Sequence, residues 1–157
     1  MDLDFKLNNF RFNSRVSAII YNKDKSKVLL FKVEDGRDYF LLPGGRIGIN
    51  EDSKSAIIRE IKEELDFDLD FELCSIQENF VKKGNIDIMQ YCFCYKTIYN
   101  EKIDKNEFKS LDNDGQTFHW TNIDELDNIK LLPKACKNLI QKSNLSLKHI
   151  IEKNRDL

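Results

Sequence analysis

The stretch that most constrains this chain covers residues 44–67, GGRIGINEDSKSAIIREIKEELDF. Two glycines lead through a polar loop into a segment with helical periodicity, which we expect to begin at an N-capping Ser53 and to end near Leu65. At about 100° per residue, its glutamates share one sector of the helix and its apolar residues form the neighbouring stripe. The glutamate face of this helix is therefore predicted to bind a ligand, while its apolar face packs against the rest of the protein.

The acidic residues of this stretch predict a site for a divalent cation. They are Glu51 in the loop and Glu60, Glu63 and Glu64 on the expected helix. Three carboxylates on one helical face repel one another unless a cation neutralises them, and hard oxygen ligands suit magnesium or manganese. Beside a diphosphate, such an ion offsets phosphoryl charge and activates a water for in-line attack.

The same helix also admits a purely structural interpretation. Its glutamates could form salt bridges on a solvated face with Lys54, Arg59 and Lys62, as many acidic helices do. The glycine loop and the distant Glu51, at these spacings, favour the metal site.

Segments on both sides of this stretch show the alternation and turn residues of β-strands. We expect a hairpin before the glycines, a longer hairpin after the helix, and then a late strand and a second helix. The expected strands are residues 15–21, 27–33, 38–42, 71–80, 86–99 and 116–121, with a helical turn at 124–126 and a helix at 133–142. The charged segment 100–115 is expected to be a mobile loop, and residues 145–157 to be strand or helix.

Length and charge limit the kinds of protein that this chain can be. Its 157 residues fit one domain over residues 1–157, and 25 basic and 27 acidic side chains, mixed along the sequence, give a net charge of -2. Such a balance provides no global field for nucleic acid or membranes. Since neither a signal peptide nor 18 consecutive apolar residues occur, we expect a cytoplasmic protein. The four scattered cysteines are expected to be buried core residues.

The order of these residues resembles the signature of the Nudix hydrolase family. The pattern is Gly45, five residues, Glu51, seven residues, Arg59-Glu60-Ile61, one residue, Glu63-Glu64. The order of hairpin, glycine exit, helix, hairpin and late tryptophan strand is also similar to that family. The resemblance implies an α/β fold, namely a Nudix-type α/β/α sandwich with a mixed β-sheet, and hydrolysis of a phosphoanhydride bond.

The resemblance assigns the metal site to individual residues. It implies that Glu60, Glu63 and Glu64 supply ligands to Mg²⁺, or Mn²⁺, and that the carbonyl of Gly44 completes the set. Glu60 is also the first candidate for the general base.

Other signature positions resemble the family's supporting residues. Arg59 and Glu51 look like a pair in which the arginine holds an acid in place, next to the loop residue Gly45. Asp66 departs from the pattern, because the family usually has glycine there. Aspartate tolerates the left-handed conformation at modest cost, so we expect lower stability rather than lost activity.

Residues outside the signature are candidates for the rest of the site. The family often takes a further acid from a late loop, where this chain has Asp112 and Asp114, and we favour Asp114 because it precedes Gly-Gln. Arg46, directly after the glycines, is the best candidate to bind substrate phosphates. Arg37 and Arg15, near strand ends on the same side, are weaker candidates for the same role.

The reaction class follows from these residues, whereas the leaving group does not. We expect a nucleotide-type substrate, a nucleoside diphosphate linked to another group: ADP-ribose or another nucleotide sugar, a dinucleoside polyphosphate or a nucleoside triphosphate. In family members that read purines, the counterpart of residues 131–136 helps to line the base pocket. Lys134 and Ala135 stand here in place of the Asn or Asp found in enzymes specific for oxidised guanine, which argues against that substrate.

Two further functions remain open on the same scaffold. A Nudix-like domain can sense a nucleotide without cleaving it, although such a module would be expected to have lost some of its glutamates. An isomerase acting on an isoprenoid diphosphate would need a reactive cysteine, Cys92 or Cys94, facing the metal. The family resemblance also makes a homodimer reasonable.

Overall fold

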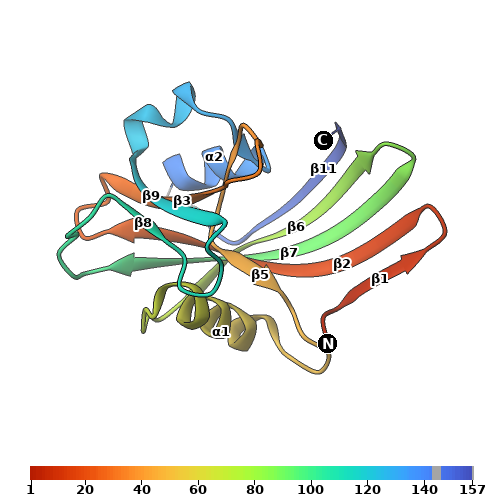
Figure 1. Cartoon of the computed structure of the whole chain (residues 1–157), viewed down its shortest axis with the longest axis horizontal. Coiled ribbons are helices and arrows are strands. Elements are labelled where there is room, and N and C mark those ends of the chain that lie inside the picture. Colours follow the sequence, from red (N-terminus) through yellow and green to blue (C-terminus); the bar gives the residue numbers. More distant parts are fainter. Residues whose placement is uncertain (143–145, 157) are drawn as a thin grey trace.

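A strongly curved mixed β-sheet forms the centre of the molecule (Figure 1). The computed structural model describes residues 1–142 and 146–156, with side chains as far as residue 153. The strands are β1 (Asp4–Leu7), β2 (Phe10–Asn22), β3 (Lys27–Val33), β4 (Phe40–Leu41), β5 (Gly44–Arg46), β6 (Glu72–Lys83), β7 (Ile86–Tyr99), β8 (Glu107–Lys109), β9 (Gln116–Asn122), β10 (Leu131–Leu132) and β11 (Lys148–Asp156). The helices are α1 (Ser53–Leu65), a 3₁₀ helix (Ile123–Asn128) and α2 (Ala135–Gln141).

The sheet is organised around the parallel pair β2 and β7. Along the sheet the order is β10-β4-β3-β2-β7-β6-β11, while β1 and β5 pair with β2, and β9 pairs with β3 and β8. β2 and β7 stay in register over the whole of β2, from Phe10 opposite Asp87 to Asn22 opposite Tyr99. The expected hairpins β2–β3 and β6–β7 are both confirmed, the second through a turn in which Gly84 has a φ of 62°.

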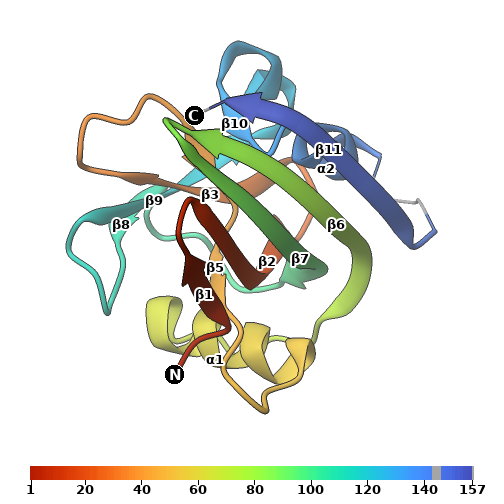
Figure 2. The same ribbon diagram turned by 90° about the vertical axis from the view of Figure 1, so that its right-hand side faces the viewer.

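Alternation along β2 divides its side chains between two hydrophobic cores. Val16, Ala18 and Ile20 face α1, whereas Ile19 and Tyr21 face α2 on the opposite side of the sheet. Figures 1 and 2 show the two helices on opposite faces. The predicted α/β/α sandwich with a mixed sheet is therefore confirmed.

Helix α1 begins and ends where its capping groups allow. The carboxylate of Asp52 accepts a hydrogen bond of 2.9 Å from the backbone N–H of Ser55, so Asp52 is the N-cap and the prediction of Ser53 is wrong by one residue. At the other end Asp66 adopts the left-handed conformation, with φ of 56°, and its N–H donates to the carbonyl of Lys62. The predicted end near Leu65 is confirmed.

The sheet is larger than expected at the amino terminus. Strand β1 and residues 10–14 of β2 extend it, and Asn8 turns the chain between them with a positive φ of 51°. In both segments the apolar residues alternate with polar and charged ones, but each segment is too short to predict a strand from sequence alone. Their strand conformation depends on pairing, and β7, the partner of residues 10–14, is far away in the sequence.

Two further strands, β8 and β11, lie after the second hairpin in segments where the sequence does not clearly predict a strand. The expected loop 100–115 contains β8, in which Phe108 stacks on Phe118 of β9 with ring centroids 5.7 Å apart, so the loop prediction is wrong for Glu107–Lys109. Of the two alternatives for the tail, the strand is correct, since β11 pairs in parallel with β6. Within the part of the chain that the structure describes, no helix is long and apolar enough to span a membrane.

Adjacent isoleucines on α1 test the packing of this helix. Ile57 is fully buried against the sheet, whereas Ile58 is 44% exposed. We expect Ile57→Ala to lower the free energy of unfolding by about 2–4 kcal/mol, because it leaves a cavity in the core, and Ile58→Ala to lower it by less than about 1 kcal/mol. Urea denaturation of both variants measures the difference, and equal losses would contradict the observed orientation of α1.

Candidate active site

The glycine pair lets strand β5 approach β2 and α1 more closely than any other residue type would allow. Gly44 has a φ of 145°, and a Cβ at this position would lie 2.1 Å from the carbonyl oxygen of Val16. A Cβ on Gly45 would lie 2.3 Å from the carboxyl group of Glu60. The carboxylate of Glu60 is therefore pressed against the backbone of β5, and a side chain at either glycine would force the two elements apart.

The guanidinium of Arg59 ties α1 to the loop before it. It donates hydrogen bonds of 2.7 and 2.9 Å to the two carboxylate oxygens of Glu51, one of 3.1 Å to the carbonyl of Arg46 and one of 2.8 Å to Glu60. Glu51 also accepts a hydrogen bond of 2.7 Å from the N–H of Gly48, and the Arg59 contact lowers the pKa of Glu51. The supporting roles of Arg59 and Glu51 stay a prediction, which this hydrogen-bonded pair supports.

Glu64 is a buried carboxylate whose negative charge is only partly offset by its surroundings. The residue is only 4% exposed, and its Oε2 is buried with no hydrogen-bond partner. Burial, followed by repulsion from Glu60 and Asp112, raises the pKa of Glu64 to about 8, while the backbone of Gly44 and the charge of Arg15 oppose that rise. Burial also raises the pKa of Glu60. Such a cluster is stabilised by a cation.

The three predicted ligands are not gathered around one point in this structure. Glu60 and Glu63 both turn toward Arg59, at 2.8 and 3.4 Å, and among the described residues no group of three or more acidic, His or Cys side chains could hold a metal ion. The donor chemistry nevertheless fits a hard divalent cation, because Glu64 keeps an unpartnered buried oxygen and repels Glu60. Glu60 and Glu63 would turn away from Arg59 to hold the ion together with Glu64.

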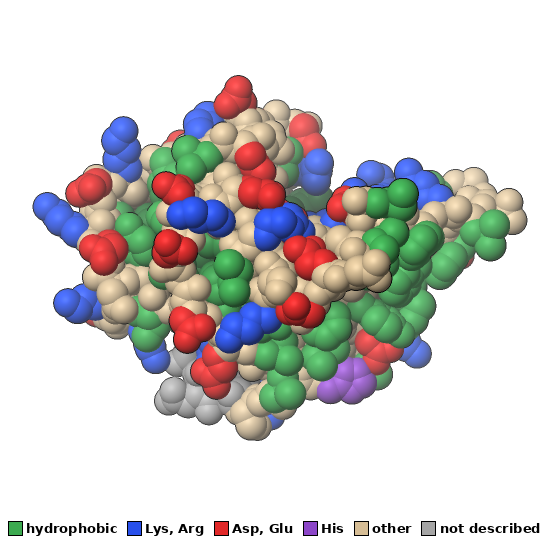
Figure 3. Space-filling model, turned by 90° about the horizontal axis from the view of Figure 1, so that it is seen from below, with side chains coloured by type: hydrophobic (Ala, Val, Ile, Leu, Met, Phe, Trp, Pro, Cys, Tyr) green, Lys and Arg blue, Asp and Glu red, His purple; other side chains and the backbone are tan. Residues whose placement is uncertain are grey.

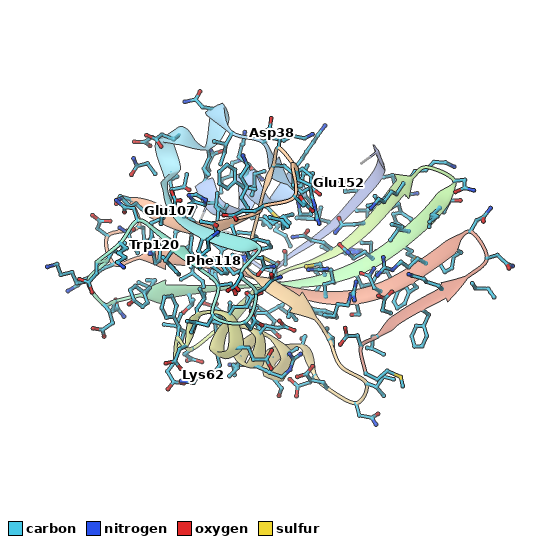
Figure 4. The ribbon with its side chains drawn as sticks, in the orientation of Figure 1. Asp38, Lys62, Glu107, Phe118, Trp120 and Glu152 are labelled. Atoms are coloured by element: carbon cyan, nitrogen blue, oxygen red, sulfur yellow. The ribbon has the colours of Figure 1, made fainter. Side chains whose placement is uncertain are left out.

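The lysines of α1 do not pair with these glutamates. Lys62 points away from the sheet (Figure 4) and lies 2.7 Å from Asp66, while Lys54 lies 3.6 Å from Asp70. Of the three basic residues expected to form salt bridges with the glutamates, only Arg59 does so.

Arg46 is held by the amino-terminal residues rather than facing open solvent. Its guanidinium lies 3.2 Å from Asp4 and 3.6 Å from Asp2, and Asp4 also accepts two hydrogen bonds from Arg11. The backbone pairs alongside, with the N–H of Leu3 donating to Ile47 and the N–H of Ile49 donating to Met1. The predicted phosphate-binding arginine is thus engaged in ion pairs here.

The other two predicted arginines line a cavity of about 340 Å³ on the α2 side of the sheet. Arg37 lies in the β3–β4 loop and is paired with Asp35 at 2.6 Å. Arg15 lies on β2, where burial lowers its pKa and the charges of Glu60 and Glu64 raise it. Arg15 is therefore within electrostatic range of the acidic cluster as well as on the cavity wall.

The late loop approaches the acidic cluster through Asp112. The N–H of Leu111 donates to the carbonyl of Glu64 at 2.9 Å, which anchors the loop on α1, and Ser110 donates a hydrogen bond of 2.8 Å to the Asp112 carboxylate. Asp112 is among the groups that raise the pKa of Glu64. Asp112 and Asp114 are both exposed, and Asp114, which the sequence favours, lies two residues further along the loop.

A profile of the NUDIX domain matches residues 11–142 of this chain. The chain belongs to the Nudix family. The prediction from the signature residues is confirmed at the level of the family, and with it that of a hydrolase acting on phosphorus anhydrides. A comparison with curated proteins gave no match.

Solved Nudix structures share the fold at low sequence identity. The MutT protein from Bacillus halodurans is 17% identical, with a TM-score of 0.64 over 87% of this chain and 89% of that one. The dihydroneopterin triphosphate pyrophosphohydrolase of E. coli is 16% identical, with a TM-score of 0.65 over 82% and 92%. An ADP-ribose pyrophosphatase from Streptococcus suis is 17% identical, with a TM-score of 0.56 over 89% and 98%. At these identities the similarity establishes the fold.

Part of the Nudix cavity wall was not predicted. Gln90, Asn113 and Gln116 line it, and Oε1 of Gln116 is buried without a hydrogen-bond partner. Cys92 lines it too, 3.4 Å from the hydroxyl of Ser17, and Cys74, Cys92, Cys94 and Cys136 are all buried as expected. Only the register between β2 and β7, which places Cys92 opposite Arg15, indicates which face these side chains occupy.

Removing the charge of Glu64 tests its burial. Because folding raises its pKa from 4.5 to about 8, the folded state holds this proton more tightly than the unfolded chain, and stability is lost as the pH rises through this interval. In EDTA at pH 8 we expect Glu64→Gln to raise the free energy of unfolding by about 1–2 kcal/mol, since the buried amide offsets part of the gain.

The matched control is Glu63→Gln, whose carboxylate is 49% exposed and which we expect to change stability little. Urea denaturation at pH 5 and pH 8 separates the two. A Glu64→Gln variant with no advantage at pH 8 over pH 5 would contradict the account of a strained buried carboxylate.

Proposed function

We propose that this chain is a magnesium-dependent pyrophosphohydrolase that cleaves a phosphoanhydride bond in a nucleotide-type substrate. The observation that carries the proposal is the position of Arg15, which lies on the cavity wall and within electrostatic range of Glu60 and Glu64. A diphosphate is an anion that such an arginine attracts, and it would span from the acidic cluster to the cavity.

The proposed site residues have three roles: to bind the metal ion, to accept a proton from water, and to hold the loop against α1. Glu60, Glu63, Glu64 and the Gly44 carbonyl would hold Mg²⁺ or Mn²⁺, which would supply positive charge to offset that of the diphosphate. Glu60 is the proposed base for the attacking water, because burial raises its pKa above that of an ordinary glutamate. Arg59 ties α1 to the loop through Glu51 and the carbonyl of Arg46, and is a positioning residue.

The cavity sets the size of the group beyond the diphosphate. A volume of about 340 Å³ fits a nucleoside or a group of similar size. Leu132, Pro133 and Cys136 line it, in agreement with the expectation that residues 131–136 contribute to the base pocket. The Nudix neighbours named for ADP-ribose and for dihydroneopterin triphosphate share this fold, so the fold leaves both kinds of substrate open.

A nucleotide-sensing module without turnover is the second candidate. It is favoured by the ion pairs of Glu60 and Glu63 with Arg59, because these pairs keep the two carboxylates from gathering around a metal ion. Calorimetry with ADP-ribose in excess Mg²⁺, followed by analysis of the mixture for products, distinguishes binding alone from hydrolysis.

Substitution of Glu60 tests the proposed chemistry. With a panel of nucleoside triphosphates, ADP-ribose and dinucleoside polyphosphates, we expect Glu60→Gln to lower kcat by about 100-fold or more in saturating Mg²⁺, because the amide cannot accept a proton. The control is Glu125→Gln, an exposed glutamate outside the site, which should retain wild-type turnover. EDTA should abolish wild-type activity, and turnover of Glu60→Gln within a few-fold of wild type would refute the assignment.

The two late-loop aspartates give a matched pair. We expect Asp112→Asn to lower kcat by about 10- to 100-fold and Asp114→Asn to change it by less than about 3-fold, because Asp112 is the one that acts electrostatically on Glu64. In the Asp112→Asn variant the amide oxygen can still accept the hydrogen bond from Ser110, so the loop should keep its shape. The opposite order of effects would assign the role to Asp114.

A further inference from the structure

The sheet face that α1 covers continues beyond the helix as an apolar surface. Strands β1, β2, β6, β7 and β11 extend to the right of α1 in Figure 1, and Figure 2 looks onto the end of this extension. We call this surface the lower apolar face; its members are Phe5, Leu7, Phe10, Phe12, Ile76, Phe80, Met89, Tyr91 and Ile151. Figure 3 shows hydrophobic side chains gathered over this region.

The strand register places these side chains on the same side of the sheet. Phe5 is paired with Phe12, and Phe12 with Met89, which is in turn paired with Phe80. Paired residues on neighbouring strands project to the same face. Phe12 contacts Tyr91 edge-to-face with ring centroids 5.4 Å apart, so part of the face is already packed within the monomer.

This face is too large to be ordinary surface. Phe5, Leu7, Phe10 and Ile151 are 54%, 71%, 44% and 56% exposed. Taking about 200 Å² for each large side chain, these four alone leave roughly 450 Å² of apolar surface in water, and the half-buried members bring the total to the order of 650 Å². A standard protein–protein interface buries about 800 Å² on each partner.

The charges on this face are balanced, which favours a protein over an anionic membrane. Lys82 and Asp87 lie 3.4 Å apart at its end, and Glu78 bonds His149 at 2.6 Å. Lys153 lies over the ring of Phe80, 5.6 Å from its centroid. An anionic lipid surface attracts an excess of basic residues, whereas a face with both signs can pair with its own copy.

We propose that the lower apolar face binds a second copy of this chain. A two-fold axis through the face sets sheet against sheet, as in an aligned β-sandwich, and buries the same aromatic residues from both copies. The face is continuous with the core under α1, because Phe93, which follows Tyr91 on the same side of β7, packs against that core. The dimer thus extends an existing core, and it does not depend on the proposed function.

Sedimentation velocity of the full chain tests this interface. Over about 1–100 µM we expect the wild type to sediment mainly as a species of twice the 18.5 kDa chain mass. The double variant Phe10→Asp, Ile151→Asp should be monomeric at the same concentrations, since each carboxylate would be buried against apolar residues. The control Ile58→Asp, a comparably exposed isoleucine on α1, should remain a dimer.

Thermal melts of all three proteins check that each one is folded. Hydrogen exchange of the wild type gives a second measurement that needs no substitution. We expect protection of β1 and of residues 86–91 to increase with protein concentration. A wild type that is monomeric at about 100 µM overturns the proposal, as does a dimer that survives the double variant. A monomer that binds neutral phosphatidylcholine vesicles through this face would also overturn it, in favour of lipid.

Discussion

The contact between the backbone of Gly44 and that of Val16 is the constraint on which the site depends. It brings β5 onto β2 with no room for a Cβ atom, and the next glycine lets the carboxylate of Glu60 rest on the same strand. Arg59 then fixes the helix to the loop through Glu51 and the Arg46 carbonyl. Two glycines and one guanidinium therefore set the distance between the loop carbonyls and the acids of α1.

The helix and its chemistry could be predicted from sequence because their determinants are local. The spacing of Glu60, Glu63 and Glu64, the apolar stripe beside them and the helix end near Leu65 all lie within one short stretch. The sequence predicts the N-cap one residue late because Asp52 and Ser53 are both good capping residues, and only the hydrogen bond from the N–H of Ser55 distinguishes them.

The remainder depends on contacts between residues far apart in the sequence. The register of β2 with β7 places Cys92 opposite Arg15 and Gln90 opposite Asn13, and no local pattern specifies this register. The position of Asp112 likewise follows from a backbone hydrogen bond between Leu111 and Glu64. β1 is a strand because it pairs with β2, where Phe5 lies opposite Phe12, and this pairing is not visible in the residues of β1 alone. The single domain that the length suggests remains a prediction.

The ion pairs between the amino-terminal acids and Arg46 have a practical consequence. Met1 and Leu3 are bonded to the backbone of the signature loop, and Asp2 and Asp4 neutralise the arginine beside its glycines. An affinity tag fused ahead of Met1 would therefore emerge next to this loop, and a charged tag would alter the field around Arg46. A protein purified with such a tag, and one from which it has been removed, are not equivalent samples for kinetic work.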